Sequence, residues 1–310
     1  QFQRGVGSSL YGVSSFGGSM NIETSDISSG DDIQVFSNFG SYDTYKLGMK
    51  LAKLFLNKIK LNLRLSKIKS DGYRDNSATD LWAFYTSMAY KGKRSITELN
   101  YYGGNERTHA SWYASYEGDL EENHQQNPIT YDNEIDDFSQ PHLELHHRYY
   151  LNKKSDLVNT FFYIHGNGFY EQFKAGRDLW EYGLNDIKDA VESDLVRQKK
   201  VIKNQYGWVS KLSYSHTKGK LTIGGYISLF DSEHFGEVVS LETEGVIAPD
   251  FYEGFEYYNY TGDKKYYTFY ANEQIKLFKD LNLMANLYYQ KINYKFEQHE
   301  AGNFEGAFLN

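Results

Sequence analysis

Apolar and polar residues alternate along most of this chain with a period of two. The clearest runs lie at 59–66, 221–229 and 281–289, where every second residue is apolar and most of those between are polar. This period is typical of a β-strand with one apolar and one polar face. Each run spans roughly nine residues, which is the length that a tilted strand needs to cross a bilayer. The pattern predicts β-strands that lie either in a membrane or half-buried in a soluble protein.

The connections between the strands distinguish these two environments. Strands are predicted near 31–40, 43–54, 58–69, 80–90, 96–104, 141–151, 156–168, 205–216, 220–231, 264–278 and 281–297. Tight links at 55–57, 91–95, 152–155, 217–219 and 279–280 alternate with long ones at 70–79, 105–140, 170–204 and 232–263. The link near 40–42 is the one exception, because it is short although it lies at the end of the sheet where the other links are long. Outer-membrane barrels have tight periplasmic turns and long extracellular loops, so the alternation favours an all-β, transmembrane antiparallel β-barrel over a soluble lectin.

Three places depart from this pattern. Glu273 and His147 fall on apolar strand faces. A charge facing lipid at mid-depth costs about 2–4 kcal/mol if it is basic and less if it is acidic. We therefore expect these two residues near a membrane interface, or shifted to the other face by a β-bulge. Between the strands, Leu184, Ile187 and Val191 have near-helical spacing, which predicts a short helix over 183–192 within a loop.

Composition agrees with a membrane barrel. The 29 Tyr and 20 Phe would supply aromatic girdles at the two membrane interfaces, and only 3 Pro interrupt the chain. No run of 18 apolar residues could form a transmembrane helix. The mean hydropathy of -0.66 is low, but a barrel shows lipid only every second side chain. The absence of Cys carries little weight, and the net charge of -8 argues against a nucleic-acid partner.

The first two dozen residues carry the most specific motif. An Arg-Gly-x-x-Ser-x-Leu-Tyr-Gly pattern is followed by a spacer, a Gly-Gly pair and an Asn-Ile strand. It resembles the end of the plug domain of TonB-dependent outer-membrane receptors, with Val6 at the place of a common Pro. Glycines there permit tight turns and close backbone approach inside a crowded lumen. The motif residues with a structural role are Arg4, Gly5, Gly7, Tyr11, Gly12, Gly17, Gly18 and Asn21.

Three later segments extend the resemblance over most of the chain. Residues 127–134 and 142–146 are similar to the second large loop and the descending strand of iron-type receptors, and 193–199 resembles the next large loop. These loop motifs are less specific than the plug motif. The resemblance implies that 1–26 is the C-terminal end of a plug domain and that 27–310 is the N-terminal part of the barrel.

The resemblance also implies a fragment of a larger receptor. Complete transporters of this kind have about 22 strands around a plugged lumen, and about eleven are predicted here. We expect the signal peptide, the energy-coupling box, most of the plug and the second half of the barrel to lie outside this chain. Eleven strands leave two unpaired edges, so the piece alone is not expected to fold stably.

The function implied by the resemblance is energised uptake of a scarce ligand through the outer membrane of a Gram-negative bacterium. A ferric siderophore is the first choice, and cobalamin, haem or an oligosaccharide remain open. The implied partners are the TonB energy-coupling complex, the lipid bilayer with its lipopolysaccharide, and an iron carrier or other small ligand. A passive porin or an adhesin is the alternative class, against which the plug motif argues.

Candidate site residues fall into two groups. The loop aromatics are candidates for ligand binding, because aromatic faces beside a few polar groups suit an extracellular ligand; an aromatic girdle is the alternative reading. They are Trp112, Tyr113, Tyr116, Trp180, Tyr182 and Tyr252. Four polar residues of one strand are candidates for the lumen wall: His142, Glu144, His146 and Arg148. Metal binding by this set is possible at i, i+2 spacing, but a hydrated polar wall is the simpler interpretation.

No catalytic chemistry is expected. The chain has no complete Gly-x-Ser-x-Gly, no dinucleotide-binding loop, no Cys and no His-Glu-x-x-His. The acidic run at 134–137 is expected to be solvated surface, and although Ca²⁺ is conceivable there, an EF-hand pattern is lacking. We therefore expect neither an enzyme, nor a cofactor, nor a bound metal.

Overall fold

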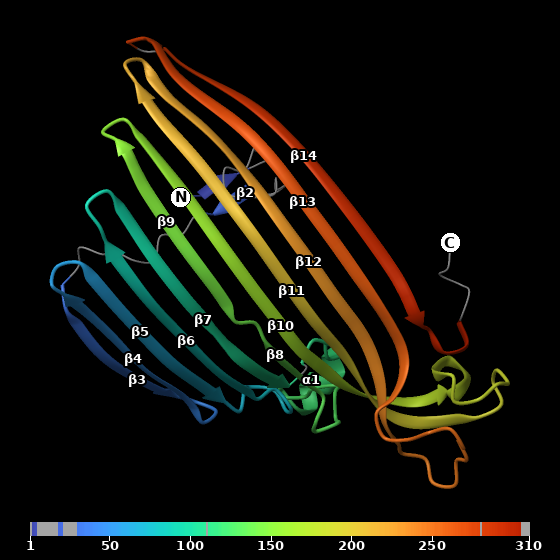
Figure 1. Ribbon diagram of the computed structural model, residues 1–310. Helices are drawn as coiled ribbons and strands as arrows, with labels where there is room; N and C mark the ends of the chain where they lie inside the picture. Colours follow the sequence, from blue (N-terminus) through green and yellow to red (C-terminus); the bar gives the residue numbers. More distant parts are fainter. Residues whose placement is uncertain (1, 5–17, 21–29, 110, 280, 305–310) are drawn as a thin grey trace.

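The computed structural model describes residues 2–4, 18–20, 30–109, 111–279 and 281–304. Most of them belong to one large antiparallel sheet of twelve strands, which curves strongly across its width (Figure 1). Two short strands, β1 (Phe2–Arg4) and β2 (Gly18–Met20), pair with each other in a separate sheet. Among the described residues, no helix is long and apolar enough to cross a membrane.

The large sheet follows the chain from one edge to the other. Its strands are β3 (Asp32–Gly40), β4 (Thr44–Phe55), β5 (Ile59–Ser70), β6 (Thr79–Lys91), β7 (Ser95–His109), β8 (Ile135–Ser139), β9 (His142–Asn152), β10 (Ser155–Asp178), β11 (Glu192–His216), β12 (Gly219–Leu241), β13 (Phe255–Phe278) and β14 (Leu281–Glu300). Each strand pairs with the next in antiparallel register, except that β8 and β9 lie end to end between β7 and β10; β3 and β14 form the edges. All predicted strands are confirmed, with ends that differ by a few residues outside β10–β13.

One crossing of the sheet is divided into two strands. Both β8 and β9 pair with β7 on one side and β10 on the other, and the register continues across the break. The break falls at Gln140 and Pro141. Proline has no N–H to donate to a ladder, so the ladder is interrupted there, although the Pro141 carbonyl still accepts a hydrogen bond from the His165 N–H at 3.1 Å. The sheet therefore crosses eleven times with twelve strands, and β8 lies in what the sequence predicts as loop.

Short and long connections alternate as predicted. The links 56–58, 92–94, 153–154 and 217–218 lie at one end of the sheet, at the upper left of Figure 1. The long connections 71–78, 179–191 and 242–254, and the one between β7 and β8, lie at the opposite end. All long loops therefore extend from the same side of the sheet.

The prediction for the last strands is wrong in length. Strands β10–β13 have 24, 25, 23 and 24 residues, so much of the predicted loops 170–204 and 232–263 is strand. Register shifts at Lys174/Arg177, Val196/Arg197 and Gly236/Glu237 interrupt the alternation in these extensions. A period-two reading loses such strands because each bulge moves side chains to the other face.

The predicted helix at 183–192 is also wrong. A single turn of 3₁₀ helix, η1 (Leu179–Tyr182), precedes this segment, and the side chain of Asp178 accepts a hydrogen bond from the Trp180 N–H at 3.1 Å. Gly183 then adopts a left-handed conformation with φ of 71°, which ends the turn. The structure has an unpredicted helix elsewhere, α1 (Glu117–Glu122), in the loop before β8.

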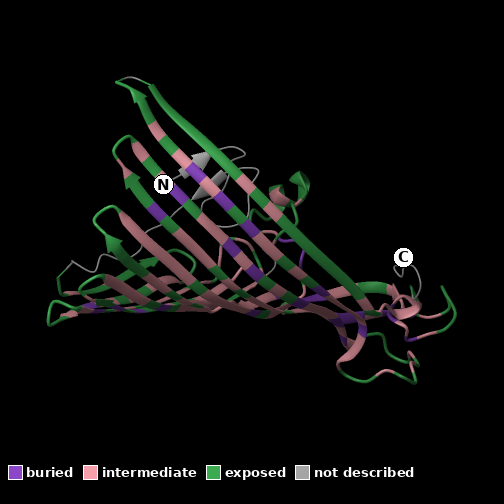
Figure 2. Cartoon of the chain, turned by 45° about the horizontal axis from the view of Figure 1, so that its top comes forward, coloured by how far each residue is buried: buried purple, intermediate pink, exposed green. Residues whose placement is uncertain are grey.

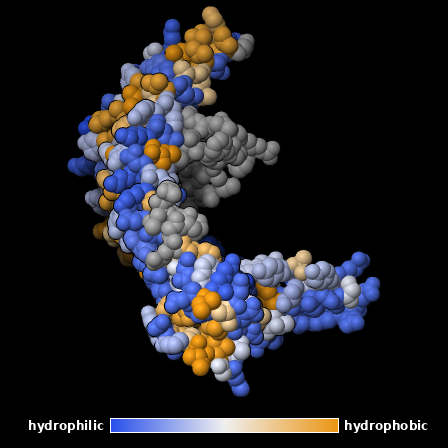
Figure 3. Space-filling view, turned by 90° about the vertical axis from the view of Figure 1, so that its right-hand side faces the viewer, coloured by the Kyte–Doolittle hydropathy of each residue, from blue (hydrophilic) through white to orange (hydrophobic). Residues whose placement is uncertain are grey.

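The two faces of the sheet differ in chemistry. Along β12, Ile223 and Leu229 are exposed, whereas Thr222 and Ser228, each one residue before them, are buried. Cross-strand pairing carries this apolar row over the sheet, through Trp208 of β11 and its neighbours. Side chains crowd on the concave face of a curved sheet, so the polar, less exposed row is the concave one. Figure 2 shows this alternation of burial along the strands, and Figure 3 shows the curvature from the side.

The apolar row forms a band on the convex face at the tight-turn end. On β11 it runs from Tyr206 to Tyr214, and above Tyr206 the same face becomes polar at Asn204. A tilted strand needs about 9–11 residues to cross a bilayer, which matches this band. We call it the apolar belt. Strands β10–β13 extend well beyond it at the long-loop end.

Glu273 and His147, the two polar residues on apolar strand faces, lie on the convex face. Glu273 lies close to the tight-turn end of β13, where it accepts a hydrogen bond from His216 Nε2 at 2.8 Å. His147 pairs with Thr97 Oγ1 at 2.8 Å. The register of both strands is regular at these residues, so a bulge is not their explanation. A position near the interface explains Glu273, and a local polar partner accompanies each residue.

A lysine placed in the apolar belt should destabilise the protein only on the convex face. We expect Leu65→Lys, which points outward in the middle of β5, to lower the free energy of unfolding of the complete receptor in lipid vesicles by about 2–4 kcal/mol. The control is Ser66→Lys, one residue along on the concave face, which should cost much less. Urea titration of heat-modifiable gel mobility measures both, and equal losses would contradict the assignment of the faces.

Candidate functional site

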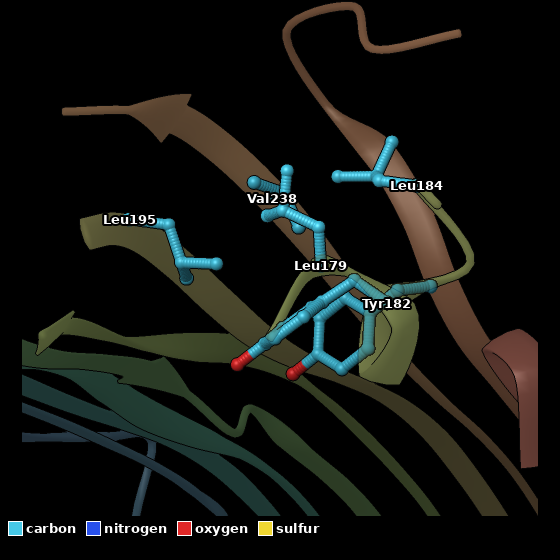
Figure 4. Close-up of a cluster of buried hydrophobic side chains, with 6 residues drawn as sticks. Leu179, Tyr182, Leu184, Leu195 and Val238 are labelled. Atoms are coloured by element: carbon cyan, nitrogen blue, oxygen red, sulfur yellow. The ribbon is translucent and has the colours of Figure 1, made fainter. Parts of the chain in front are cut away.

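The extended ends of β10–β13 enclose a small hydrophobic core beyond the apolar belt. Its buried side chains are Leu179, Tyr182, Leu184, Leu195, Val238 and Tyr257, and five of them are labelled in Figure 4. They come from η1, the following turn and three different strands. Burial of each such side chain contributes about 1.5–3 kcal/mol, so this cluster fixes η1 against the strands beside it.

A cavity of about 310 Å³ opens next to this core. Residues of β11, β13, β14, η1 and the segment after β14 line it: Glu181, Tyr182, Arg197, Tyr257, Tyr258, Tyr260, Gln298, Ala301 and Phe304. Pairing places Tyr258 and Tyr260 in the same row as Lys199 and His234, on the concave face. The cavity, called the tyrosine pocket below, therefore lies at the long-loop end of the concave wall.

Arg197 is held in a fixed orientation in this pocket. Its Nη1 donates to Tyr182 Oη at 3.1 Å and its Nη2 donates to Gln172 Oε1 at 3.1 Å. Neither acceptor is a carboxylate, so these bonds orient the guanidinium without neutralising it. Glu181, a carboxylate that lines the pocket, forms an ion pair with Arg177. It therefore does not neutralise the charge of Arg197.

The surroundings of Arg197 are positively charged. Burial, together with the nearby Arg197 charge, lowers the pKa of Lys174 and of Lys199. Glu134 partly offsets this charge near Lys174, although burial raises the pKa of Glu134 itself. Burial also raises the pKa of Tyr257 and Tyr258, so both hydroxyls stay protonated and can donate. Such an arrangement of cations and hydroxyl donors suits an anionic ligand.

Cations stacked on aromatic rings continue down the concave wall from the pocket. Lys199 Nζ lies 5.8 Å from the centre of the Tyr170 ring, and Lys203 Nζ lies 4.8 Å from that of Phe138. Gly166 makes room for Lys203, because a Cβ at this position would lie within 2.5 Å of the lysine side chain. These contacts keep the ammonium groups over the wall and within reach of a ligand.

The loop aromatics predicted as ligand-binding residues fall into separate groups. Tyr182 is 1% exposed and belongs to the hydrophobic core, and it also lines the pocket. Trp180 packs edge-on against Phe304 at 4.9 Å, beside the pocket. Tyr252 is 61% exposed in the 242–254 loop and packs edge-on against Phe255. The structure thus brings two of these three residues, Trp180 and Tyr182, to the pocket.

The other three predicted aromatics lie in the loop between β7 and β8. Trp112, Tyr113 and Tyr116 are all exposed, Tyr116 at 80%. Trp112 meets the edge of the Tyr170 ring at 6.1 Å, which connects this loop to the concave wall. They form a second aromatic surface, separate from the tyrosine pocket.

Arg74 holds this second loop in place. From the 71–78 connection, its guanidinium donates to the carbonyl oxygens of Gln126, Ser111 and Tyr113 at 3.2, 3.1 and 3.0 Å. It also donates to Ser115 Oγ at 2.9 Å. Asn127 adds bonds to the carbonyls of Asp75 and Asn76. The two loops therefore form one hydrogen-bonded unit that presents its aromatic side chains in fixed positions.

The four predicted lumen residues share the concave face of β9 and bond to their neighbours. Glu144 accepts from Tyr102 Oη at 2.7 Å and pairs with His146 Nε2 at 2.9 Å. His142 stacks on Tyr102 with ring centres 4.8 Å apart, and Arg148 lies 3.8 Å from Asp156. No cluster of three metal-ligating side chains occurs among the residues that the structure describes. These contacts make the set a hydrogen-bonded part of the wall.

Two further sequence expectations meet the structure differently. Glu134 is buried and lies near Lys174, so the expectation of a solvated acidic run is wrong at its first residue. Of the plug-end motif, Arg4 lies in β1 and Gly18 in β2. The remaining motif residues, Gly5, Gly7, Tyr11, Gly12, Gly17 and Asn21, lie outside the described residues.

Sequence reasoning missed the residues that dominate the pocket. Arg197 and Lys199 stand in a segment noted only as a loop motif, and the tyrosines of β13 lie in a predicted loop. The density of aromatic residues at 252–260 was the available signal. A second cavity, of about 360 Å³, lies around Pro141 and Leu143 on the convex face. Since that face carries the apolar belt, we do not treat it as the ligand site.

Comparison with known proteins identifies the fold. No protein-family model matches the sequence, and no curated protein matches it. Solved structures do match. The ferric-catecholate import receptor Fiu from E. coli K12 has a TM-score of 0.73 at 15% identity, over 95% of this chain and 49% of the receptor. The ferripyoverdine receptor of the outer membrane of Pseudomonas aeruginosa has a TM-score of 0.70 at 9% identity, over 96% of this chain and 41% of the receptor.

The siderophore receptor PiuA from Acinetobacter baumannii has a TM-score of 0.62 at 11% identity and covers 94% of this chain. The chain spans 50% of PiuA, 49% of Fiu and 41% of the ferripyoverdine receptor. The chain therefore has the fold of outer-membrane siderophore receptors over about half of their length. This confirms the predicted fold class, an antiparallel transmembrane-type β-barrel seen in part.

Removing the Arg74 side chain should loosen the loop that carries Trp112, Tyr113 and Tyr116. Arg74→Ala deletes four hydrogen bonds, so we expect local opening to become easier by roughly 2–4 kcal/mol. Amide exchange across 111–126 should then be at least about tenfold faster. Arg94→Ala, an exposed arginine in a tight turn at the other end, is the control. Unchanged exchange in Arg74→Ala would show that the loop is held by other contacts.

Proposed function

We propose that this chain belongs to a TonB-dependent receptor that imports a ferric siderophore across the outer membrane of a Gram-negative bacterium. One observation carries the proposal: a positively charged, tyrosine-lined pocket lies at the long-loop end of a sheet with the fold of siderophore receptors. Long loops are extracellular in such barrels, so this pocket is where a ligand arrives from outside.

The concave wall supports passage as well as capture. Below the tyrosine pocket, Lys199 and Lys203 follow along β11 toward the apolar belt, and Lys264 of β13 lies 5.8 Å from the Phe230 ring. A row of cations over aromatic rings offers several weak sites in succession. A ligand released from the pocket can therefore move down the wall without meeting a single deep trap.

The proposed division of labour follows the expected domains. Residues 1–26 end the plug, and 27–310 form the wall that the plug blocks. The TonB complex acts on the plug from the periplasm, because the outer membrane carries no energy source of its own. The lipid bilayer and its lipopolysaccharide surround the apolar belt. The proposed receptor performs no covalent chemistry, which agrees with neighbours that are receptors and import proteins.

Other ligands of the same fold are cobalamin, haem and an oligosaccharide, and a passive porin or adhesin is the remaining class. Oligosaccharide sites combine aromatic faces with neutral polar groups. The lysines and arginine around the tyrosine pocket favour an iron complex over a sugar. A passive porin needs an open lumen, which the plug-end motif argues against.

The proposal predicts gene-dependent uptake that requires energy. Cells that carry the complete gene should accumulate radiolabelled iron from ferric siderophores under iron limitation, and cells lacking the gene should not. Collapse of the proton-motive force should abolish this accumulation. Labelled cobalamin and haem are tested in parallel. Uptake that persists without the proton-motive force would contradict an energised receptor, and accumulation of cobalamin or haem alone would move the ligand to another class.

A further inference from the structure

A buried lysine of β5 holds the segment that leads into the first strand of the large sheet. Lys60 Nζ donates a hydrogen bond to the backbone carbonyl of Gly30 at 2.6 Å. Gly30 lies shortly before β3, at the tight-turn end, so this bond joins β5 to the start of β3 across the intervening strand β4. Lys60 is only 1% exposed although it is charged. Burial of an ammonium group costs free energy unless hydrogen bonds compensate it, so a lysine at this position needs a specific reason.

Two aspartates fix the same segment to β4. Asp31 Oδ1 accepts a hydrogen bond from the Leu54 N–H at 2.8 Å, and its carboxylate forms an ion pair with Lys53. Asp32 forms an ion pair with Lys50 at 3.0 Å. Successive side chains of a strand point to opposite faces, so Lys50 and Lys53, three positions apart, lie on different faces of β4. The start of β3 is therefore bonded to its neighbour on both faces of the sheet.

The three contacts act as one group. The positive charge of Lys60 acts on the carboxylates of both Asp31 and Asp32. An exposed ion pair by itself stabilises a protein very little. Here the two pairs flank a buried hydrogen bond whose donor is charged, and charge-assisted hydrogen bonds are the stronger kind. Residues 30–32 are thus held more firmly than either ion pair alone would hold them.

The place of these contacts matters in a receptor whose plug is pulled from the periplasm. Residues 1–26 are expected to end the plug, and the wall begins at residues 30–32. Tight turns are periplasmic in such barrels, so a pull toward the periplasm acts along β3 from its first residue. The hydrogen bonds of a sheet lie across its strands, and this pull loads the bonds between β3 and β4 together. The load enters the wall at residues 30–32.

We propose that Lys60, Asp31 and Asp32 form an anchor that holds residue 30 when the energy-coupling complex pulls on the plug. This rests on the proposed function, in which that complex acts on the plug. The plug can then yield while β3 stays paired with β4 and the wall stays closed. Lys60 is the main positioning residue of the anchor, because it ties the segment to a strand that does not pair with β3.

The test pulls the purified full-length receptor in a lipid bilayer from its N-terminus, on the periplasmic side, at constant force. Contour length, at about 3.3–3.6 Å per residue, identifies the state in which the chain is extended up to residue 30. The lifetime of this anchored state is measured. Lys60→Met removes the ammonium group and keeps a long side chain, and Asp31→Ala removes the carboxylate. Lys58→Met and Asp71→Ala are matched controls, because they make the same changes at exposed positions outside the anchor.

We expect Lys60→Met to shorten the lifetime of the anchored state about tenfold and Asp31→Ala about fivefold, because each loses a charge-assisted contact. Lys60→Arg keeps a charged donor and should recover most of the wild-type lifetime. Both controls should behave as wild type, and the unfolding steps before residue 30 should be unchanged in every variant. Heat-modifiable gel mobility verifies that each variant folds. If Lys60→Met misfolds, Asp31→Ala carries the test.

Failure of this inference is distinct from failure of the proposed function. The inference is overturned if wild type shows no pause at residue 30, or if the pause lasts as long in the folded anchor variants as in wild type. It is also overturned if the earlier unfolding steps weaken as much as the pause does, because the substitutions then act on the whole receptor. Iron uptake in cells is a separate measurement. If the pause depends on Lys60 but cells import no iron, the anchor stands and the proposed function fails.

Discussion

The structure depends on one constraint, which is that every backbone N–H and C=O in a lipid environment needs a partner. A sheet satisfies this requirement strand by strand, and its pleat then gives each residue to one face or the other. The apolar belt and the polar concave wall are therefore two outcomes of a single alternation. Because pairing is regular from β4 to β13 within the belt, a residue's position in a strand already determines whether it faces lipid or lumen.

Beyond the belt the constraint changes, and so does the architecture. Water can satisfy backbone and side-chain groups there, so the long ends of β10–β13 are stabilised by their own packing. The core of Leu179, Tyr182, Leu195 and Val238 supplies that packing. It also positions the proposed ligand site, since Tyr182 and Tyr257 belong both to the core and to the lining of the tyrosine pocket. Stability of the loop end and preorganisation of the site are thus the same set of contacts.

The extent to which the sequence predicted this structure follows from the same difference. Within the belt, alternation and link length predict every crossing, because a polar side chain that faces lipid costs a large free energy. Outside it, bulges at Val196/Arg197 and Gly236/Glu237 disrupt the period, so the sequence pattern predicts loops where the strands extend. The sequence predicts a strand that starts at Pro141, although pairing with β10 continues on both sides of this residue. Tyr182 is predicted as a ligand-binding loop aromatic, but its burial depends on partners distant in sequence that no local pattern reveals.

The central claim is that the sheet crosses the outer membrane with the tyrosine pocket on the outside. This chain contains no Cys, so once any cysteine elsewhere in the complete receptor is replaced by Ser, single cysteines can be introduced here and probed with a membrane-impermeant maleimide on intact cells. The account predicts rapid labelling at position 116, no labelling at 218 in a tight turn until the outer membrane is permeabilised, and no labelling at 229 in the apolar belt in either case. Labelling at 218 but not at 116 on intact cells would contradict it.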